Sequence, residues 1–182
     1  MIEPASSGCR PNELFIDFGV ESWYLLTDRS QGLDMDLVMR QFGKKEPGQD
    51  YPERLSAYAL LIGDDNRLLV VRHRGLLFLP GGGVDDGETL DKAVCREVLE
   101  EVGWTIQVVR EVGHAGQYAF QPVKRRHVNK ISHFFTAKIT DRSGRGIEPD
   151  HQPMWVTVSE FAENAAHESH VWAAELALSS ED

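Results

Sequence analysis

The sequence predicts an α/β fold, and three observations carry this prediction. Short β-suited runs recur along the chain, one long amphipathic helical pattern interrupts them, and two shorter helical patterns follow near the end. The chain has 182 residues, of which 41% are hydrophobic. This length is enough for one globular domain with its own core, with an extension at one end.

The strand predictions rest on runs rich in β-branched, aromatic and aliphatic residues. These runs are Ser56–Ile62, Arg67–Arg72, Leu76–Leu79, Thr105–Val112, Gly116–Phe120, Ile131–Ile139 and Trp155–Val158. Residues 63–66, Gly-Asp-Asp-Asn, have the composition of a hairpin turn between the first two runs. A basic loop from Lys124 to Lys130 is expected before Ile131.

The clearest helix is predicted from Thr89 to Val102. Thr89 is its candidate N-cap, and Gly103 is a candidate left-handed stop. Two further helices are expected over Ser159–Ala165, with Ser159 as the N-cap, and over Glu168–Leu178.

Residues 1–50 read as an N-terminal extension, and residues 51–182 as the main domain. Met1–Arg10 lacks periodicity, and Gly43–Pro52 has the composition of a connector. Between them, Leu14–Phe18 and Trp23–Leu26 favour short strands and Leu33–Phe42 a short helix. The extension is expected to add strands, to cover the site, or to exchange between the subunits of a homodimer.

The net charge and the two cysteines limit which ligands and which cellular compartment we expect. The formal net charge of -10 argues against binding to duplex DNA, so a phosphate ligand must be held locally by metal or a few arginines. Cys9 and Cys95 form no CxxC pattern, which favours a reduced, cytoplasmic compartment. Neither a membrane span nor a signal peptide is indicated, so we expect a soluble, unprocessed protein without a membrane partner.

The helix 89–102 carries carboxylates where they destabilise it. At 100° per residue, Glu97 and Glu101 fall on the apolar stripe, and Glu100 lies at its edge. Like charges at this spacing cost roughly 0.2–0.5 kcal/mol per pair, and carboxylates near a helix C-terminus cost about 0.3–1 kcal/mol each. Within the helix only Glu100 has a basic partner at three or four residues, Arg96, so Glu97 and Glu101 are expected without helical counterions.

A divalent cation would supply the missing positive charge. Carboxylate and water oxygens suit Mg²⁺, with Mn²⁺ as the second choice, better than Zn²⁺. A solvated acidic face is the alternative, and the register of the three glutamates opposes it. The glycine-rich segment Pro80–Glu88 is expected as a loop before the helix, where it is either a flexible turn or one wall of the same site.

The pattern Gly82-x5-Glu88-x7-Arg96-Glu97-Val98-x-Glu100-Glu101-x-Gly103-Trp104 resembles the Nudix box. Every charged and glycine position matches, and Trp104 stands where the family usually has an aliphatic residue. The box covers 23 residues, and the flanking strands extend the resemblance to about Arg54 through Leu178. It implies the family's fold, a mixed β-sheet between helices.

The resemblance also implies site residues and an activity. Glu97, Glu100 and Glu101 would bind magnesium with the carbonyl of Gly81, while Arg96 and Glu88 brace the box. The family cleaves phosphoanhydride bonds of nucleoside diphosphate derivatives by attack of a metal-activated water. Glu101 or Glu100 is the first choice for the general base. Outside candidates are Glu148 and His151, although a loop histidine is commonly a plain surface residue.

Residues outside the box give weaker substrate predictions. Arg72, Arg74, Lys124, Arg125 and Arg126, with His127 beside them, are candidates to bind phosphate or else are solvated. Tyr118, Phe120, Phe134, Phe135 and Trp155 are candidates to stack on a base or else are core. His133 reads as an ordinary strand histidine.

Two classes of function remain in competition. The first is a magnesium-dependent pyrophosphohydrolase acting on a nucleotide or another small organic diphosphate. The second is a binding module that senses a nucleotide without turnover. The complete set of Glu97, Glu100 and Glu101 favours the enzyme. A nucleic-acid binder ranks third because of the net charge.

Overall fold

The computed structural model describes residues 40–122, 124–146, 148 and 150–179. Eleven elements follow one another in this part of the chain. They are β1 (Arg40–Phe42), β2 (Glu53–Leu60), β3 (Leu68–His73), β4 (Leu76–Phe78), β5 (Gly81–Gly83), α1 (Leu90–Val102), β6 (Thr105–Gln121), β7 (Arg126–Asp141), β8 (Gln152–Val156), α2 (Val158–Asn164) and α3 (Glu168–Ser179).

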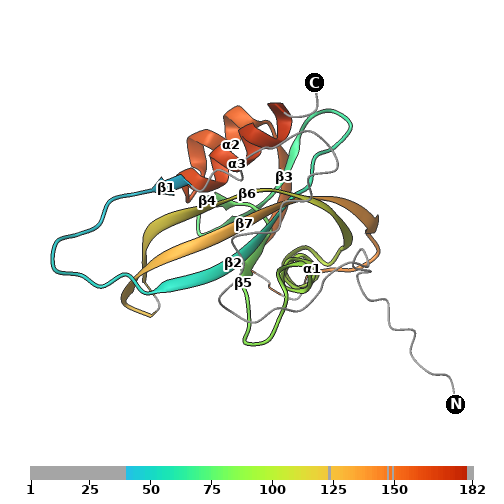
Figure 1. Ribbon diagram of the computed structural model, residues 1–182. Coiled ribbons are helices and arrows are strands. Elements are labelled where there is room, and N and C mark those ends of the chain that lie inside the picture. The colour runs from blue at the N-terminus through green and yellow to red at the C-terminus, as the bar shows by residue number, and fades with distance from the viewer. Residues whose placement is uncertain (1–39, 123, 147, 149, 180–182) are drawn as a thin grey trace, which may run out of the picture.

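The strands form two sheets. The larger sheet is mixed and has the order β1-β6-β7-β2-β5, with β1/β6 and β7/β2 parallel and the other neighbours antiparallel. The smaller sheet is antiparallel, with the order β4-β3-β8. Figure 1 shows α1 on one side of these strands and α2 with α3 on the other. The predicted mixed sheet between helices is therefore confirmed.

Two hydrophobic clusters fill the space between the layers. One joins β2, β3 and β7 to α2 and α3, with Phe134 and Phe161 fully buried. The other packs the apolar stripe of α1, including Val94 and Val98, against Ala57, Ala59 and Phe135. Alternation along β2 and β7 supplies both clusters, because successive side chains in a strand point to opposite faces.

The local signals for α1 are confirmed. Thr89 is the N-cap residue with extended backbone, and Gly103 ends the helix at φ 80° with its N–H donated to the carbonyl of Leu99. A side chain at Gly103 would meet the backbone of Arg145 at 2.2 Å, so the loop that follows β7 packs closely on this helix end.

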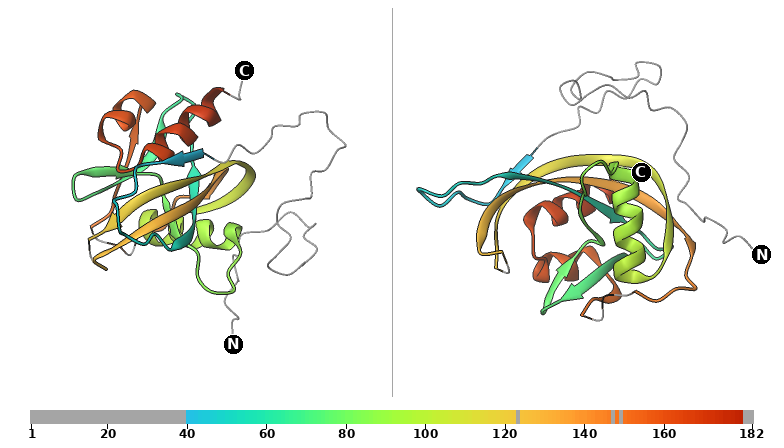
Figure 2. Two further views of the ribbon diagram at one scale, coloured as in Figure 1. Left: turned by 60° about the vertical axis from the view of Figure 1, so that its left-hand side comes forward. Right: turned by 90° about the horizontal axis from the view of Figure 1, so that it is seen from below.

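Several boundaries differ from the sequence prediction. The runs Thr105–Val112 and Gly116–Phe120 are one long strand, β6, which Figure 2 shows as a curved ribbon beside β7. A side chain at Gly113, within this strand, would meet the ring of Trp172 at 3.1 Å, so α3 packs closely on the strand there. The prediction of a loop over Lys124–Lys130 was wrong from Arg126 onward. Residues 126–130 already pair with β6, so only a short turn remains.

Two other predictions were wrong in detail. The N-cap of α2 is Thr157 rather than Ser159, because Thr157 and Glu160 form a reciprocal capping box. The glycine run Gly81–Gly83 is an edge strand rather than a loop, because it pairs with Ser56–Tyr58 of β2.

The predicted elements before residue 40 lie outside the described residues. Within the predicted helix Leu33–Phe42, residues 40–42 are instead strand β1, paired with Ala115–Gln117 of β6. No helix in the described part of the chain is long and apolar enough to cross a membrane.

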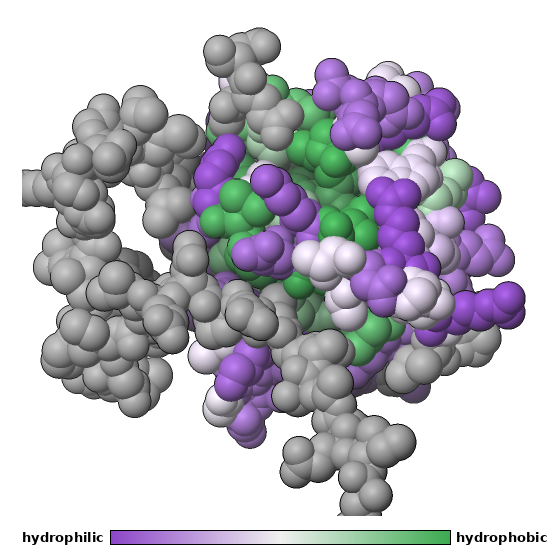
Figure 3. All heavy atoms as spheres, turned by 90° about the vertical axis from the view of Figure 1, so that its right-hand side faces the viewer, coloured by the Kyte–Doolittle hydropathy of each residue, from purple (hydrophilic) through white to green (hydrophobic). Residues whose placement is uncertain are grey.

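Hydrophobic residues also reach the surface. Figure 3 shows them interspersed with hydrophilic residues on the face that it presents. Leu99 and Val109 are about half exposed. Single exposed residues of this kind are normal for a soluble domain.

Candidate active site

The C-terminal half of α1 and strand β5 form one wall of a cleft of about 340 Å³. Glu97 and Glu101 line it together with Gly81, Gly82 and Gly83. The cleft therefore joins the two features that the sequence suggested as parts of one site. Glu100 and Arg96 are not among its lining residues.

The glycines allow the carboxylates to reach the backbone. Gly81 has φ 139°, and a side chain there would meet the carbonyl oxygen of Ala57 at 2.3 Å. A side chain at Gly82 would lie 2.7 Å from the carboxylate of Glu97. The N–H of Gly81 donates to Oε2 of Glu101 over 2.9 Å. Glycine is required at both positions because a side chain at Gly81 would collide with the backbone of Ala57, and one at Gly82 with the carboxylate of Glu97.

Arg96 holds the box together from behind the cleft. It donates from Nε and Nη2 to the two carboxylate oxygens of Glu88, both over 2.9 Å, and from Nη2 to the carbonyl of Gly83 over 3.0 Å. This bidentate pair lowers the pKa of Glu88 and raises the pKa of Arg96. Arg96 is therefore a bracing residue, as the resemblance implied.

Arg96 also corrects one prediction. Its Nη1 donates to Glu97 over 3.0 Å and to Glu100 over 3.3 Å. Glu97 thus has a helical counterion at the adjacent position, because the long guanidinium group reaches around the helix. Glu101 has no contact with arginine or lysine among the described ion pairs.

The electrostatics of Glu97 and Glu101 disfavour their charged forms. Burial raises the pKa of Glu97, against the opposing effect of Arg96. Burial, with the charges of Glu97 and Glu148 adding to it, raises the pKa of Glu101 to about 8. A cation between these carboxylates would reverse both effects.

The segment before β8 brings two further groups to Glu101. The backbone N–H of Glu148 donates to the carbonyl of Glu100 over 3.4 Å, which docks this segment on the end of α1. His151 Nδ1 lies 3.6 Å from Oε1 of Glu101 and in direct contact with Oε2 of Glu148. Burial lowers the pKa of His151, opposed by the charge of Glu148. Glu101, Glu148 and His151 are close enough to share one metal ion.

These groups fit a hard divalent cation. Glu97, Glu101 and Glu148 line the same cleft, and of these three carboxylates only Glu97 has an ion pair with Arg96. Such an oxygen-rich set suits Mg²⁺ or Mn²⁺. Glu100 is turned toward Arg96 and does not line the cleft.

The rest of the cleft lining includes basic and polar side chains. The basic ones are Arg54, Lys124 and Lys130, and Gln121, Ser56, Tyr58, His73 and Phe78 are among the others. Arg54 and Lys130 are register neighbours on the parallel strands β2 and β7. The sequence reading missed Arg54, although its alternation with Ser56 and Tyr58 places all three on one face of β2.

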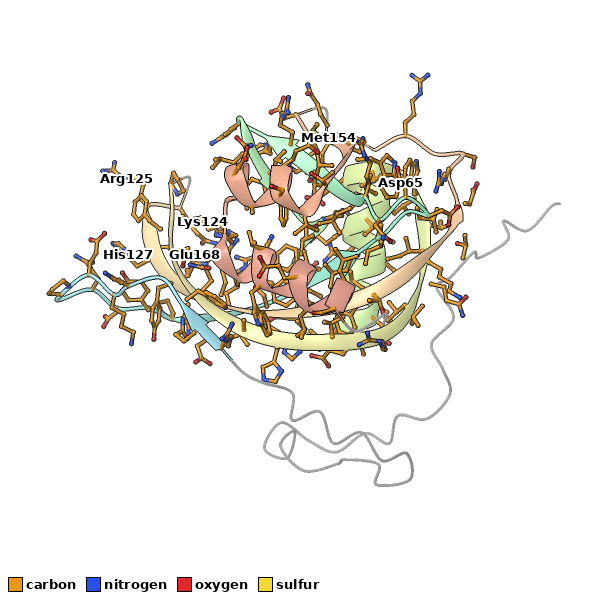
Figure 4. All side chains as sticks on the ribbon, turned by 90° about the horizontal axis from the view of Figure 1, so that it is seen from above. Asp65, Lys124, Arg125, His127, Met154 and Glu168 are labelled. Carbon is orange, nitrogen blue, oxygen red and sulfur yellow. The ribbon has the colours of Figure 1, made fainter. Side chains whose placement is uncertain are left out.

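The predicted phosphate-binding residues separate in the structure. Lys124 lines the cleft, whereas Arg72, Arg74 and Arg125 are exposed and do not line it. Figure 4 shows Lys124 and Arg125 near the tip of the β6–β7 hairpin. Arg126 lines a second hollow with Asp85 and Asp86.

The predicted stacking residues also separate. Phe134 and Phe135 are core residues, and Trp155 packs near Trp104 at a centroid distance of 6.4 Å. Phe120 is 52% exposed, and Tyr118 contacts Tyr51 edge to face. None of the five lines the cleft.

Comparison with known proteins agrees with this geometry. The sequence model of the NUDIX domain matches residues 52–176, so the chain belongs to the Nudix family. Among relatives, NAD-capped RNA hydrolase NudC from Vibrio atlanticus is 26% identical over 123 residues, covering 63% of this chain and 42% of the relative. ADP-ribose pyrophosphatase from Methanocaldococcus jannaschii is 42% identical over 48 residues, covering 24% and 28%.

A Bacillus subtilis relative whose name includes 8-oxo-dGTP diphosphatase is 33% identical over 67 residues, covering 36% of this chain and 45% of the relative. The matches thus span 28% to 45% of the length of these curated relatives. A NUDIX hydrolase from Nitrosomonas europaea has a TM-score of 0.59 at 19% identity, covering 71% of this chain and 90% of the other. At this identity the likeness shows the fold.

Proposed function

We propose that this chain is a metal-dependent pyrophosphohydrolase that cleaves a phosphoanhydride bond of a nucleotide or another small organic diphosphate. One observation carries the proposal: a single cleft is lined both by the carboxylates of Glu97, Glu101 and Glu148 and by the cations of Arg54, Lys124 and Lys130. Carboxylates that could hold a metal ion, together with basic side chains, suit a diphosphate, whose charge the metal and the cations would neutralise.

Glu97 and Glu101 are the proposed ligands of Mg²⁺, and Mn²⁺ is the alternative. The resemblance adds Glu100 and the carbonyl of Gly81, but Glu100 contacts Arg96 and does not line the cleft. When bound, the ion lowers the pKa of the attacking water and offsets negative charge that develops on the phosphate. Arg96 keeps Glu97 and Glu88 in place by the hydrogen bonds described above.

The protein's own groups account for the remaining chemistry. Arg54, Lys124 and Lys130 would bind and orient the phosphates. Water would attack phosphorus while the phosphoanhydride P–O bond breaks, and its proton would pass to a base. Glu101 or Glu100 remains our choice of base, and the contact among Glu101, Glu148 and His151 supports the two outside candidates as proton acceptors.

The relatives suggest which substrates to try first. ADP-ribose, 8-oxo-dGTP and a dinucleotide of the NAD type correspond to the names of the three relatives. A panel that adds other nucleoside triphosphates, dinucleoside polyphosphates and nucleotide sugars would define the substrate. We propose a cytoplasmic site of action, in keeping with such substrates.

The proposal is tested by Glu101→Gln, which keeps the shape of the side chain and removes its charge. In the presence of Mg²⁺, we expect the rate of phosphate or nucleotide release to fall by at least about 100-fold. This is the size of effect seen when an enzyme loses a group that stabilises the transition state. Glu163→Gln, at an exposed position of α2, is the matched control and should keep full turnover. Equal turnover in both variants would refute the site, and tight nucleotide binding without turnover in the wild type would favour the sensing module.

A further inference from the structure

A second cluster of metal-ligating side chains lies on β6 and β7. Glu111 and His114 come from β6, and His133 comes from β7, paired directly with His114. A register shift between Glu111 and Gly113 inserts one extra residue there, so Glu111 and His114 lie on the same face although three positions separate them. None of the three lines the active-site cleft.

The distances in this cluster suit a small ion. His133 Nδ1 and Glu111 Oε1 are 2.7 Å apart, and His114 Nδ1 lies 3.9 Å from the same oxygen. The two imidazole rings stack at 5.1 Å with an interplanar angle of 22°. Ligand atoms around a tetrahedral Zn²⁺ are about 3.3 Å apart, as bond lengths near 2.0–2.1 Å require. The observed separations lie on either side of that value.

His114 provides the observation that a simple hydrogen-bonded pair leaves unexplained. Its Nδ1 is buried and has no hydrogen-bond partner among the described residues. Glu111 does not supply a partner either, because its Oε1 lies 3.9 Å from His114 Nδ1, which is too far for a hydrogen bond. A buried nitrogen without a partner costs free energy, and an ion held jointly with Glu111 would remove that cost.

The surrounding charge also favours a cation. Asp91, in the first turn of α1, is near enough that the charge of Glu111 adds to burial in raising its pKa. Within residues 40–122, 124–146, 148 and 150–179, no lysine or arginine forms an ion pair with Glu111. Glu111 thus has two imidazoles, neutral unless protonated, and a second carboxylate near it, but no basic ion-pair partner in the described residues.

We propose that Glu111, His114 and His133 bind one Zn²⁺ ion, separate from the metal of the active site. Two imidazoles with one carboxylate select a late first-row metal rather than Mg²⁺. The three side chains are partly exposed, at 19% to 26%, so an ion from solvent can reach them. Water is available as the fourth ligand. The ion would join β6 to β7 beside the bulge and stabilise the fold there.

The test is a Zn²⁺ competition titration against a chromophoric chelator, with the full chain freed of metal beforehand. All proteins carry Glu101→Gln, so that Zn²⁺ binding by the cluster of Glu101, Glu148 and His151 is weakened. We expect one Zn²⁺ per chain, and at least about a 100-fold loss of affinity in Glu111→Gln and in His133→Phe, because losing even an outer partner of a metal ligand costs about 10- to 100-fold. His127→Phe, at another histidine of β7, is the matched control and should bind as its parent does.

Two measurements distinguish a variant that has lost a metal ligand from a variant that does not fold. Circular dichroism shows whether each variant is folded, and the near-isosteric Glu111→Gln covers the case in which His133→Phe is not. Co²⁺ in place of Zn²⁺ should give the intense visible bands of a four-coordinate site, absent from the Glu111 and His133 variants. Equal Zn²⁺ affinity in the cluster variants and the His127 control, or no Zn²⁺ bound by the folded parent, would overturn the proposal.

Discussion

Two clusters of carboxylate and imidazole groups in this protein look alike in composition but differ in surroundings. Around Glu101, carboxylates predominate, and the cluster lines a cleft that also contains basic side chains. Around Glu111, imidazoles predominate, and none of these three residues lines either described pocket. The type of ligand would select the metal at each cluster, whereas a cleft with basic side chains beside the ion is what a catalytic metal site would need.

The largest expected effect is the loss of metal-dependent stabilisation, which should differ between the two clusters. Glu101→Gln should abolish the rise in melting temperature caused by millimolar Mg²⁺, because it removes a ligand of the folded state. His133→Phe should instead reduce the rise caused by Zn²⁺ and keep the response to Mg²⁺. Differential scanning fluorimetry measures both. A variant that loses both responses would show that the clusters are not independent, and one that loses neither would show that the substituted residue binds no metal.

A smaller effect is expected from Arg96→Lys. Lysine cannot reproduce the bidentate contact with Glu88 while also reaching Glu97 and the carbonyl of Gly83. We expect a loss of roughly 2 kcal/mol in the free energy of unfolding, the scale of one hydrogen bond to a charged group. Urea unfolding measures it. A variant as stable as the wild type would mean that the Arg96 contacts do not brace the box.

Lys130→Met tests the basic side chains of the cleft. The substitution keeps the length of the side chain and removes a charge that would face the proposed diphosphate. KM should rise about tenfold, equivalent to about 1.4 kcal/mol, with a smaller change in kcat if the lysine binds ground and transition states alike. Arg72→Met, at an exposed position outside the cleft, shows what loss of a general surface charge does. Equal KM values for both variants would remove Lys130 from the substrate site.

The smallest effect concerns acid stability, away from both clusters. Burial, with Lys130 adding to it, lowers the pKa of His167 to about 3. The unfolded chain takes up this proton near pH 6.5 and the folded chain does not, so stability present above pH 6.5 is lost as pH falls toward 3. The cost is roughly 1.4 kcal/mol per pH unit at most.

His167→Gln should therefore flatten this loss between about pH 6 and pH 4, as measured by urea unfolding at several pH values. The buried His170, whose pKa is also lowered, stays in place and leaves part of the slope. An unchanged pH profile would mean that His167 is protonated in the folded state.

The sequence alone determined those features that depend on residues within one or two helical turns. The spacing of Glu97, Glu100 and Glu101, the caps at Thr89 and Gly103, and the apolar stripe of α1 all follow from the local repeat of the helix. The family could therefore be predicted, and of the three glutamates Glu97 and Glu101 line the cleft. The same local rules placed most strands but misjudged their ends, because bulges and pairing partners decide where a strand stops.

Only the tertiary structure decided which distant groups meet. Arg54 and Lys130 are 76 positions apart and face the same cleft because β2 and β7 pair in one particular register. Glu148 and His151 reach Glu101 because their segment docks on the end of α1, and Glu111 reaches His133 because of a bulge in β6. Strand register, the packing of a loop segment on a helix and the position of a bulge depend on the packing of the whole domain. The hydrophobic periodicity of one stretch of chain does not predict them.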